Sequence, residues 1–219
     1  MTAGSLPQLA ARFARIYTGA LTDVLAELGR PSQALPAAIE PLGRGMGLVG
    51  PAFPVETRPG PSAPDEVTRA WEMLQAVPPG HVLVCATGAG DYAVLGDLAA
   101  ALLKANGCAG GLVEGGCRDI DLILEIGFPV FCGFVTPKDI SHGHGDFVAW
   151  GHTVTIGDVT IATGDYVVAD ADGAVVIPMA LIDEVLVRAE MLVRREAVVR
   201  MALLRGSSPE EAYQEATSE

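Results

Sequence analysis

Apolar residues in the middle of the chain form short continuous runs that are separated by glycine-rich turns. Three such runs, His81–Ala86, Gly110–Val113 and Phe128–Cys132, are typical of strands that are buried on both faces. Between them, residues 97–105 and 120–126 have helical spacing, and a glycine ends each pattern. This strand–helix–strand succession with short connections predicts a parallel, centrally buried sheet.

The two ends of the chain have helical patterns. Residues 6–29 predict a helix in two pieces, split near Thr18–Gly19, and a long helix is expected from about Leu181 to Leu204. A final helix is expected after Ser208, because Ser at the N-cap, Pro at the first helical position and Glu three residues after the cap form a helix-start signature.

The remaining segments predict strands, turns and one short helix. Residues 31–64 are rich in proline and glycine and predict short strands and turns, whereas residues 65–75 predict a short helix. Further on, Gly–Asp and Asp–Gly turns between strand-like pieces predict hairpins. We therefore expect a single layered α/β domain with a central sheet over residues 1–219. Its parts are N-terminal helices 6–29, central strand–helix repeats 80–135, C-terminal strands 150–178 and helices 180–216.

Composition and charge narrow the function classes. Hydrophobic residues make up 50% of the chain and charged residues 19%, which is typical of a folded globule. The net charge of -13 repels phosphate backbones, so we expect no direct nucleic-acid binding. No secretory signal or uninterrupted apolar span is present, which predicts a cytoplasmic protein without a membrane partner. The cysteines at 85, 108, 117 and 132 lack CxxC spacing and are expected to be reduced, mostly buried thiols.

The first of two glycine-rich turns leads into Gly96–Asp97–Leu98–Ala99. Ligands of open α/β sheets gather at the carboxyl ends of strands, where this turn is expected. Free amide groups at a helix start, together with the helix dipole, favour a carboxylate or a phosphate. Taken alone, Asp97 is more simply explained as an ordinary N-cap, and that alternative stays open.

The second turn places Arg118–Asp119 directly after Gly115–Gly116. A guanidinium group can hold a carboxylate or enolate oxygen through its fork of donors, and a carboxylate can hold a hard divalent cation. Mg²⁺ needs only one or two protein carboxylates, so Asp119 is chemically sufficient. The alternatives are a surface ion pair or a capped helix start.

Other candidate sites are less complete. His142, His144 and Asp146 suggest a transition-metal site, but two histidines in a glycine-rich loop lack a defined third ligand. Cys117 beside Arg118 could have a lowered thiol pKa, yet without a His–Asn arrangement we interpret it as a packing residue. A phosphate-binding GxxxxGK[ST] loop and a GxSxG nucleophile turn are both absent from the sequence.

Taken together, these motifs resemble the RraA-like family. The matching residues are Gly90–Asp91, Gly96–Asp97–Leu98, Gly107, Gly110, Glu114–Asp119, Gly127–Phe131, Gly164–Asp165, Asp170–Gly173 and Val175–Pro178. That family contains 4-hydroxy-4-methyl-2-oxoglutarate aldolases, also called 4-carboxy-4-hydroxy-2-oxoadipate aldolases, and the regulator of ribonuclease activity A. The resemblance implies a fold like the swivelling phosphohistidine domain and a homotrimer or dimer of trimers, with active sites near subunit interfaces.

The resemblance also implies roles for particular residues in a class II pyruvate aldolase that acts on a small oxo acid. Asp119 would bind Mg²⁺ or Mn²⁺, and Arg118 would bind the pyruvyl part of the substrate. The substrate carboxylate would lie against Gly96, Asp97, Leu98 and Ala99, largely through backbone amides. Asp97 would also hold a water for proton transfer, and Glu196 of a neighbouring subunit is a candidate to reach the site. Oxaloacetate decarboxylation is an expected second activity, because it passes through the same enolate.

Three departures from the family pattern leave the distal half of the substrate open. They are Glu114 in place of a usual Asp, His144 in place of a frequent Arg, and Ala162–Thr163 before Gly164–Asp165. Two other functions remain open: a non-catalytic regulator that binds a ribonuclease complex, and a related lyase or decarboxylase for a different oxo acid. The sequence does not distinguish Mg²⁺ from Mn²⁺ or a trimer from a hexamer.

Overall fold

A computed structural model describes residues 5–218 of the chain. Its strands form one large mixed sheet and one separate hairpin made of β8 and β9. The strands are β1 (Glu40–Pro41), β2 (Leu48–Pro59), β3 (Val82–Ala86), β4 (Ala93–Leu95), β5 (Gly110–Cys117), β6 (Val130–Val135), β7 (Gly145–Trp150), β8 (Val154–Ile156), β9 (Val159–Ile161), β10 (Tyr166–Asp170) and β11 (Gly173–Ile177).

The centre of the large sheet is parallel, as predicted. Its order is β1-β6-β5-β3-β2-β10-β11, with β4 beside β5 and β7 beside β2. Strands β2, β3, β5 and β6 run parallel, and β4 runs parallel to β5. Strands β1, β7, β10 and β11 pair antiparallel to their neighbours. The predicted α/β fold class is therefore confirmed.

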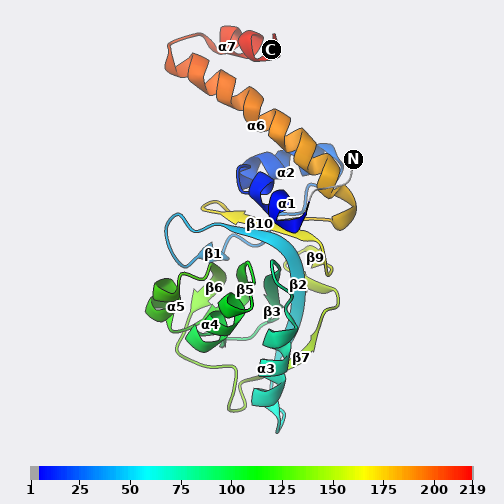
Figure 1. The fold of residues 1–219 in the computed structure, drawn as a ribbon, viewed down its shortest axis with the longest axis vertical. Helices are drawn as coiled ribbons and strands as arrows, with labels where there is room; N and C mark the ends of the chain where they lie inside the picture. Colours follow the sequence, from blue (N-terminus) through cyan, green and yellow to red (C-terminus); the bar gives the residue numbers. More distant parts are fainter. Residues whose placement is uncertain (1–4, 219) are drawn as a thin grey trace.

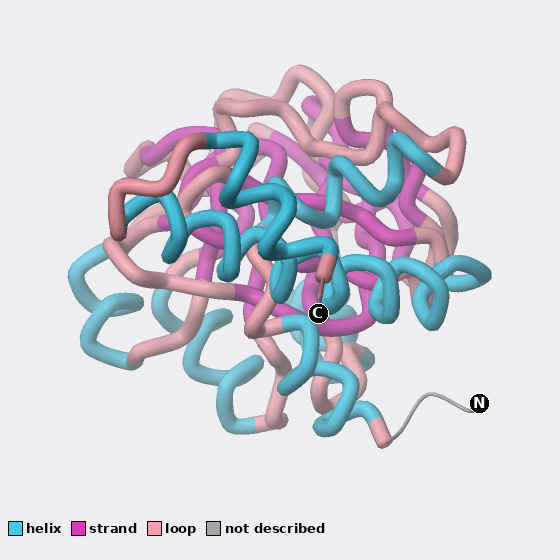
Figure 2. Tube along the Cα trace, turned by 90° about the horizontal axis from the view of Figure 1, so that it is seen from above, coloured by secondary structure: helices cyan, strands magenta, loops and turns pink. Residues whose placement is uncertain are grey.

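Helices cover the sheet in two groups (Figure 1). α3, α4 and α5 lie with the parallel strands, whereas α1, α2 and the first turns of α6 lie over β10 and β11, and Figure 2 shows the layers from above. The rest of α6 extends away from the sheet, and α7 folds back against its end. The helices are α1 (Leu6–Phe13), α2 (Thr18–Glu27), α3 (Glu66–Ala76), α4 (Asp97–Ala105), α5 (Ile120–Ile126), α6 (Ile182–Leu204) and α7 (Pro209–Thr217), with a short 3₁₀ turn at Met179–Leu181.

Proline-rich residues 31–64 differ from the prediction of short strands and turns. They contain β2, which is 12 residues long and includes Pro51, Pro54 and Pro59. Proline cannot donate a hydrogen bond to a strand ladder, which is why the pattern argued against a long strand. β2 accommodates its prolines by changing partner along its length: it pairs with β10 up to Pro51, with β3 from Ala52, and with β7 as far as Pro59.

The break between the first two helices also lies earlier than predicted. The backbone N–H and the hydroxyl of Thr18 both donate to the Asp170 carboxylate, each at 2.8 Å. This contact fixes the start of α2 at Thr18, so the break falls between Phe13 and Thr18 rather than at Thr18–Gly19. The predicted capping box at Ser208 is confirmed, since Ser208 and Glu211 exchange hydrogen bonds.

The sequence of α4 favours a helix with a well-defined end. Its sequence, DLAAALLKA, consists almost entirely of strong helix formers. The helix ends at Asn106, and Gly107 follows with φ +77°, a left-handed conformation that favours glycine. Lys104 donates a hydrogen bond to the carbonyl of Ile126 and so ties the ends of α4 and α5 together.

Glycines in β5 allow other parts of the chain to pack directly on its carboxyl end. A Cβ on Gly116 would lie 2.6 Å from Cε2 of Phe134 and 2.8 Å from the carbonyl oxygen of Tyr92. A Cβ on Gly115 would lie 2.7 Å from Oγ1 of Thr87. Contacts this short force neighbouring atoms to move, so the strand packs well only without side chains at these positions.

We predict that Gly116→Ala lowers the free energy of unfolding by about 1–3 kcal/mol, because an overpacked site must displace the Tyr92 backbone. Urea unfolding followed by circular dichroism measures this loss. Gly47→Ala is the matched control, since its Cβ would lie 3.7 Å from the carbonyl oxygen of Ala169, an ordinary contact. Equal stability of the two variants would contradict the packing argument.

Candidate active site

Two helix starts meet at the carboxyl edge of the parallel sheet. β4 and β5 are parallel neighbours, with Ala93 opposite Gly116 and Leu95 opposite Cys117. α4 begins immediately after β4, and α5 begins immediately after β5. The prediction placed the first turn directly after the strand ending at Ala86, whereas the structure inserts the three-residue strand β4. This insertion brings Gly96 next to Arg118.

The Asp119 carboxylate lies at the centre of this meeting point. Its Oδ2 atom is 3.3 Å from Nε of Arg118 and 3.4 Å from the backbone nitrogen of Asp97. Asp119 itself adopts a left-handed backbone, with φ 59° and ψ 39°. Asp tolerates this conformation better than most residues, and such backbones concentrate at functional sites. In residues 5–218 the other non-glycine residue with positive φ is His142.

Gly96 allows the two turns to approach this closely. A Cβ at position 96 would lie 2.6 Å from Oδ2 of Asp119 and 3.2 Å from Nε of Arg118. Any larger residue would therefore push the carboxylate and the guanidinium away from the start of α4.

Asp139 is a second partner of Arg118 that the sequence analysis missed. Its Oδ2 atom lies 2.6 Å from Nη1 of Arg118, so the guanidinium bridges two carboxylates. The loop holds Asp139 in place, because the Ser141 N–H donates to Oδ1 at 2.7 Å and the His144 ring nitrogen lies 2.8 Å from its carbonyl oxygen. Asp139 lies in the loop after β6, the last of the parallel strands, where no turn motif or helix start marked it in the sequence.

The exposure of this cluster indicates its role. Arg118 is 38% exposed, Asp119 33% and Asp139 23%. Ion pairs with this much solvent contact contribute little to stability. The two carboxylates instead fix the orientation of a guanidinium that a ligand can still reach.

A cavity of about 240 Å³ opens beside Arg118. It is bounded by α3, by the start of α4 and by the loop that follows β6. Its polar lining comes from Asp97, Arg118, Asp139 and Ser141, and the predicted substrate-binding residues Gly96, Leu98 and Ala99 also line it. A small anion in this cavity would meet both the guanidinium and the amide groups at the start of α4.

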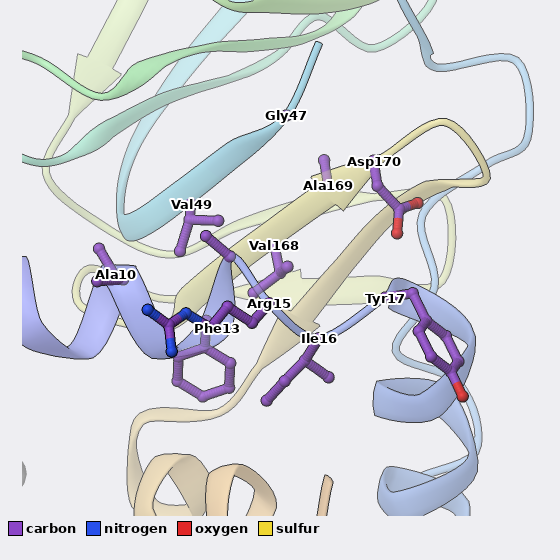
Figure 3. A pocket seen from close by; sticks show the side chains of 12 residues that line it. Ala10, Phe13, Arg15, Ile16, Tyr17, Gly47, Val49, Val168, Ala169 and Asp170 are labelled. Carbon is purple, nitrogen blue, oxygen red and sulfur yellow. The ribbon is translucent and has the colours of Figure 1, made fainter. Parts of the chain in front are cut away.

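A larger hollow of about 630 Å³ lies elsewhere, against the connection between α1 and α2 (Figure 3). Arg15 and Asp170 lie at different ends of this hollow, and the Asp170 carboxylate already accepts both hydrogen bonds from Thr18. Its polar groups do not converge on one point. The smaller cavity is therefore the better candidate, because convergent polar groups mark a ligand site more reliably than volume does.

The donor set suits a hard divalent cation. Asp119 uses Oδ2 for its contacts with Arg118 and Asp97, and hydrogen bonds among the described residues leave Oδ1 available. Within residues 5–218 no group of three His, Cys, Asp or Glu side chains converges. Mg²⁺ and Mn²⁺ accept one or two carboxylates and complete their shells with water and substrate oxygens, so Asp119 fits such an ion.

The other sequence candidates have structural partners. Asp146 lies 3.3 Å from Arg69, His144 holds the Asp139 loop, and the His142 backbone N–H points at Glu66 from 3.4 Å. The alternative of a transition-metal site formed by His142, His144 and Asp146 thus gains no geometric support.

The pKa of the Cys117 thiol is raised, not lowered as the sequence suggested. Its hydrogen bond to Cys132 and its burial both raise the pKa of the Cys117 thiol. Burial also raises the pKa of Cys85, to about 12. The four cysteines are free and buried, as predicted, so Cys117 is a packing residue.

Glu196 lies on α6, on the opposite side of the sheet from α4 and α5 (Figure 1). It does not reach Arg118 within one chain, and its contribution to a neighbouring subunit stays a prediction. Among the described residues, none of the helices has the length and apolar character that a membrane crossing requires.

Comparison with known proteins agrees with the motif resemblance. The family model described as RraA-like, Aldolase/RraA, matches residues 18–176. A protein of Halalkalibacterium halodurans with the provisional name 4-hydroxy-4-methyl-2-oxoglutarate aldolase is 32% identical over 180 residues, which are 82% of this chain and 80% of the relative. Protein DlpA of Legionella pneumophila is 28% identical over 214 residues, which cover 96% of this chain but 34% of DlpA.

Solved structures agree as well. The crystal structure of Streptomyces coelicolor RraAS2, described as an unusual member of the RNase ES inhibitor RraA family, aligns with a TM-score of 0.79 at 32% identity. That alignment covers 89% of this chain and 97% of RraAS2. The chain belongs to the RraA-like family.

Proposed function

We propose that the protein is a lyase that depends on a divalent cation and releases pyruvate from a 4-hydroxy-2-oxo acid by retro-aldol cleavage. The observation that carries this proposal is the Arg118 guanidinium, held between Asp119 and Asp139 beside the amide groups at the start of α4. The reference substrates are 4-hydroxy-4-methyl-2-oxoglutarate, which the relative's name supports, and 4-carboxy-4-hydroxy-2-oxoadipate.

Substrate binding follows from the charges around the cavity. The carboxylate of the oxo acid lies at the amide groups of Leu98 and Ala99, where the helix dipole favours an anion. Arg118 donates to the 2-oxo oxygen, on which negative charge develops during cleavage. Asp119 would hold a divalent cation, which would supply Lewis-acid stabilisation of this developing charge.

The reaction then needs a base for one proton. The bond between C3 and C4 breaks, its electron pair passes into the enolate of pyruvate, and the C4 hydroxyl proton moves to Asp97 or to a water that Asp97 orients. A proton returned to C3 completes pyruvate. Decarboxylation of oxaloacetate produces the same enolate, so we propose it as a second activity of the same residues.

The proposal includes an oligomeric assembly. A homotrimer or a dimer of trimers in the cytoplasm would allow Glu196 of one subunit to approach Arg118 of the next. Such an approach is the route by which the exposed half of α6 would contribute to the site.

The proposal predicts that chelation removes pyruvate release and that Mg²⁺ or Mn²⁺ restores it. Asp119→Asn should lower kcat/KM about 10²–10³-fold, because it removes the anionic ligand while Asn keeps the left-handed backbone. A lactate dehydrogenase-coupled assay with 4-hydroxy-4-methyl-2-oxoglutarate measures the loss, and oxaloacetate is the second substrate.

Asp121→Asn is the matched control, since Asp121 stands in the first turn of α5 and does not line the cavity. Pyruvate release that persists after chelation, or that Asp119→Asn leaves unchanged, would contradict the role of the cation. If the wild-type protein releases no pyruvate from either substrate with Mg²⁺ or with Mn²⁺, the lyase assignment is overturned.

Gly96→Ala should lower kcat/KM about 10²-fold, because it displaces the Asp119 carboxylate and the Arg118 guanidinium without changing any charge. Steady-state kinetics together with thermal unfolding separates this effect from a loss of fold. Gly19→Ala is its control, because the new Cβ on α2 would meet Tyr17 at an ordinary 3.6 Å. Full activity of Gly96→Ala would show that close approach of the two turns is not needed.

A second candidate function has one observation in its favour. The alignment with RraAS2, which is described as a member of a ribonuclease inhibitor family, covers 97% of RraAS2. A non-catalytic protein that binds a ribonuclease complex would retain ribonuclease binding in Asp119→Asn, whereas the lyase would lose pyruvate release. A lyase for a different oxo acid would keep the same cation requirement.

A further inference from the structure

The lining of the cavity beside Arg118 is mostly apolar. Its polar residues are Asp97, Arg118, Asp139 and Ser141. The other side chains, called the apolar wall below, come from α3, β4, β7 and the loop before β7 and include Val67, Trp71, Leu74, Val94, Ile140 and Phe147. If the pyruvyl half of a substrate binds the polar residues, its distal half meets mainly the apolar wall.

Cations are scarce along this wall. Among the described residues that line the cavity, Arg118 is the only cationic one, and Asp119 and Asp139 already hold it. Two neighbouring cations are directed to partners of their own. Lys138 lies 2.5 Å from Asp91, and Arg69 bonds to Asp146 and to the carbonyl oxygen of Phe147. Along the described part of the lining, a second substrate carboxylate would therefore meet no further cation, and it would lie near two further carboxylates, of Asp97 and Asp139.

Exposure of apolar side chains at the cavity gives an independent indication. Trp71 is 37% exposed, Val67 57% and Leu98 65%, although all three line the same cavity. Exposed apolar side chains of this kind mark a ligand-binding groove or a protein interface, and here the three side chains line the same cavity as Arg118.

We propose that the preferred substrate has an apolar group on C4 in place of a second carboxylate, and that Trp71 determines this preference. The inference rests on the proposed function, since it assigns the distal half of the same substrate. Cleavage breaks the C3–C4 bond as before, the C4 hydroxyl proton leaves, and C4 becomes the carbonyl of a neutral ketone or aldehyde. The products are then one pyruvate and one uncharged carbonyl compound.

The test compares two substrates that share the hydroxyl and methyl groups on C4. In 4-hydroxy-4-methyl-2-oxoheptanoate a propyl group replaces the second carboxylate of 4-hydroxy-4-methyl-2-oxoglutarate. The wild-type protein with Mg²⁺ or Mn²⁺ should cleave the propyl substrate with at least tenfold higher kcat/KM, a difference of about 1.4 kcal/mol. Trp71→Lys should reverse the preference, because it removes apolar contact and supplies the missing cation.

Tyr213→Lys is the matched control, because Tyr213 is an exposed aromatic residue on α7 that does not line the cavity. It should leave the substrate ratio unchanged. Pyruvate release with preference for the dicarboxylate would overturn the inference and leave the proposed function intact. A ratio that Trp71→Lys does not move would remove Trp71 as the determinant.

A binding measurement keeps the inference testable if no substrate is cleaved. Isothermal titration calorimetry with 2-oxohexanoate and with 2-oxoglutarate, neither of which has a C4 hydroxyl, measures both affinities in the wild-type protein and in Trp71→Lys without a tryptophan reporter. Tighter binding of 2-oxohexanoate that Trp71→Lys abolishes would support the apolar wall even where the lyase proposal fails. Tighter binding of 2-oxoglutarate would overturn it in either case.

Discussion

The Asp119 carboxylate connects the three segments that build the site. One of its oxygens faces both the Arg118 side chain and the first amide of α4, and its own backbone begins α5. This contact requires a left-handed backbone at Asp119 and no side chain at Gly96. The parallel pairing of β4 with β5 brings both requirements to the same edge of the sheet. The orientation of Arg118, which belongs to the polar lining of the cavity, depends on this arrangement.

Hydrophobic pattern predicted the parts of the fold in which burial alone decides the structure. β3 and the first half of β5 are continuous apolar runs, and only a strand covered on both faces accounts for them. The pattern did not predict β2, because its prolines are compatible with a strand only where the partner strand changes. Such a change of partner depends on residues far away in the sequence. β4 is only three residues long, too short for any periodicity, yet its pairing with β5 positions the start of α4.

The same distinction applies to the site. Gly96, Asp97, Arg118 and Asp119 could be singled out because each stands between a glycine-rich turn and the start of a predicted helix, a local signal. Asp139 could not be predicted in this way. It lies more than 20 residues from Arg118 in the sequence, and only the fold of the loop after β6 brings the two side chains together. Trp71 could not be predicted as a cavity residue for a similar reason. The sequence predicted α3 as a helix, but which face of α3 lines the cavity follows from tertiary packing. Local pattern thus found the two turns that meet at the edge of the sheet, whereas the rest of the cavity lining depends on the folded chain.

The glycines of β5 have a consequence for how this protein can change over generations. Gly115 and Gly116 lie against Thr87, Tyr92 and Phe134, so the strand that presents Arg118 and Asp119 has almost no freedom to vary. α3 has the opposite character, because Val67 and Trp71 face solvent and the cavity. Under the proposed function, the residues assigned to the chemistry and those assigned to the choice of substrate therefore stand in separate stretches of sequence, one tightly packed and one open to solvent. Substitutions in α3 would then change the substrate while the packing around Arg118 and Asp119 stayed intact.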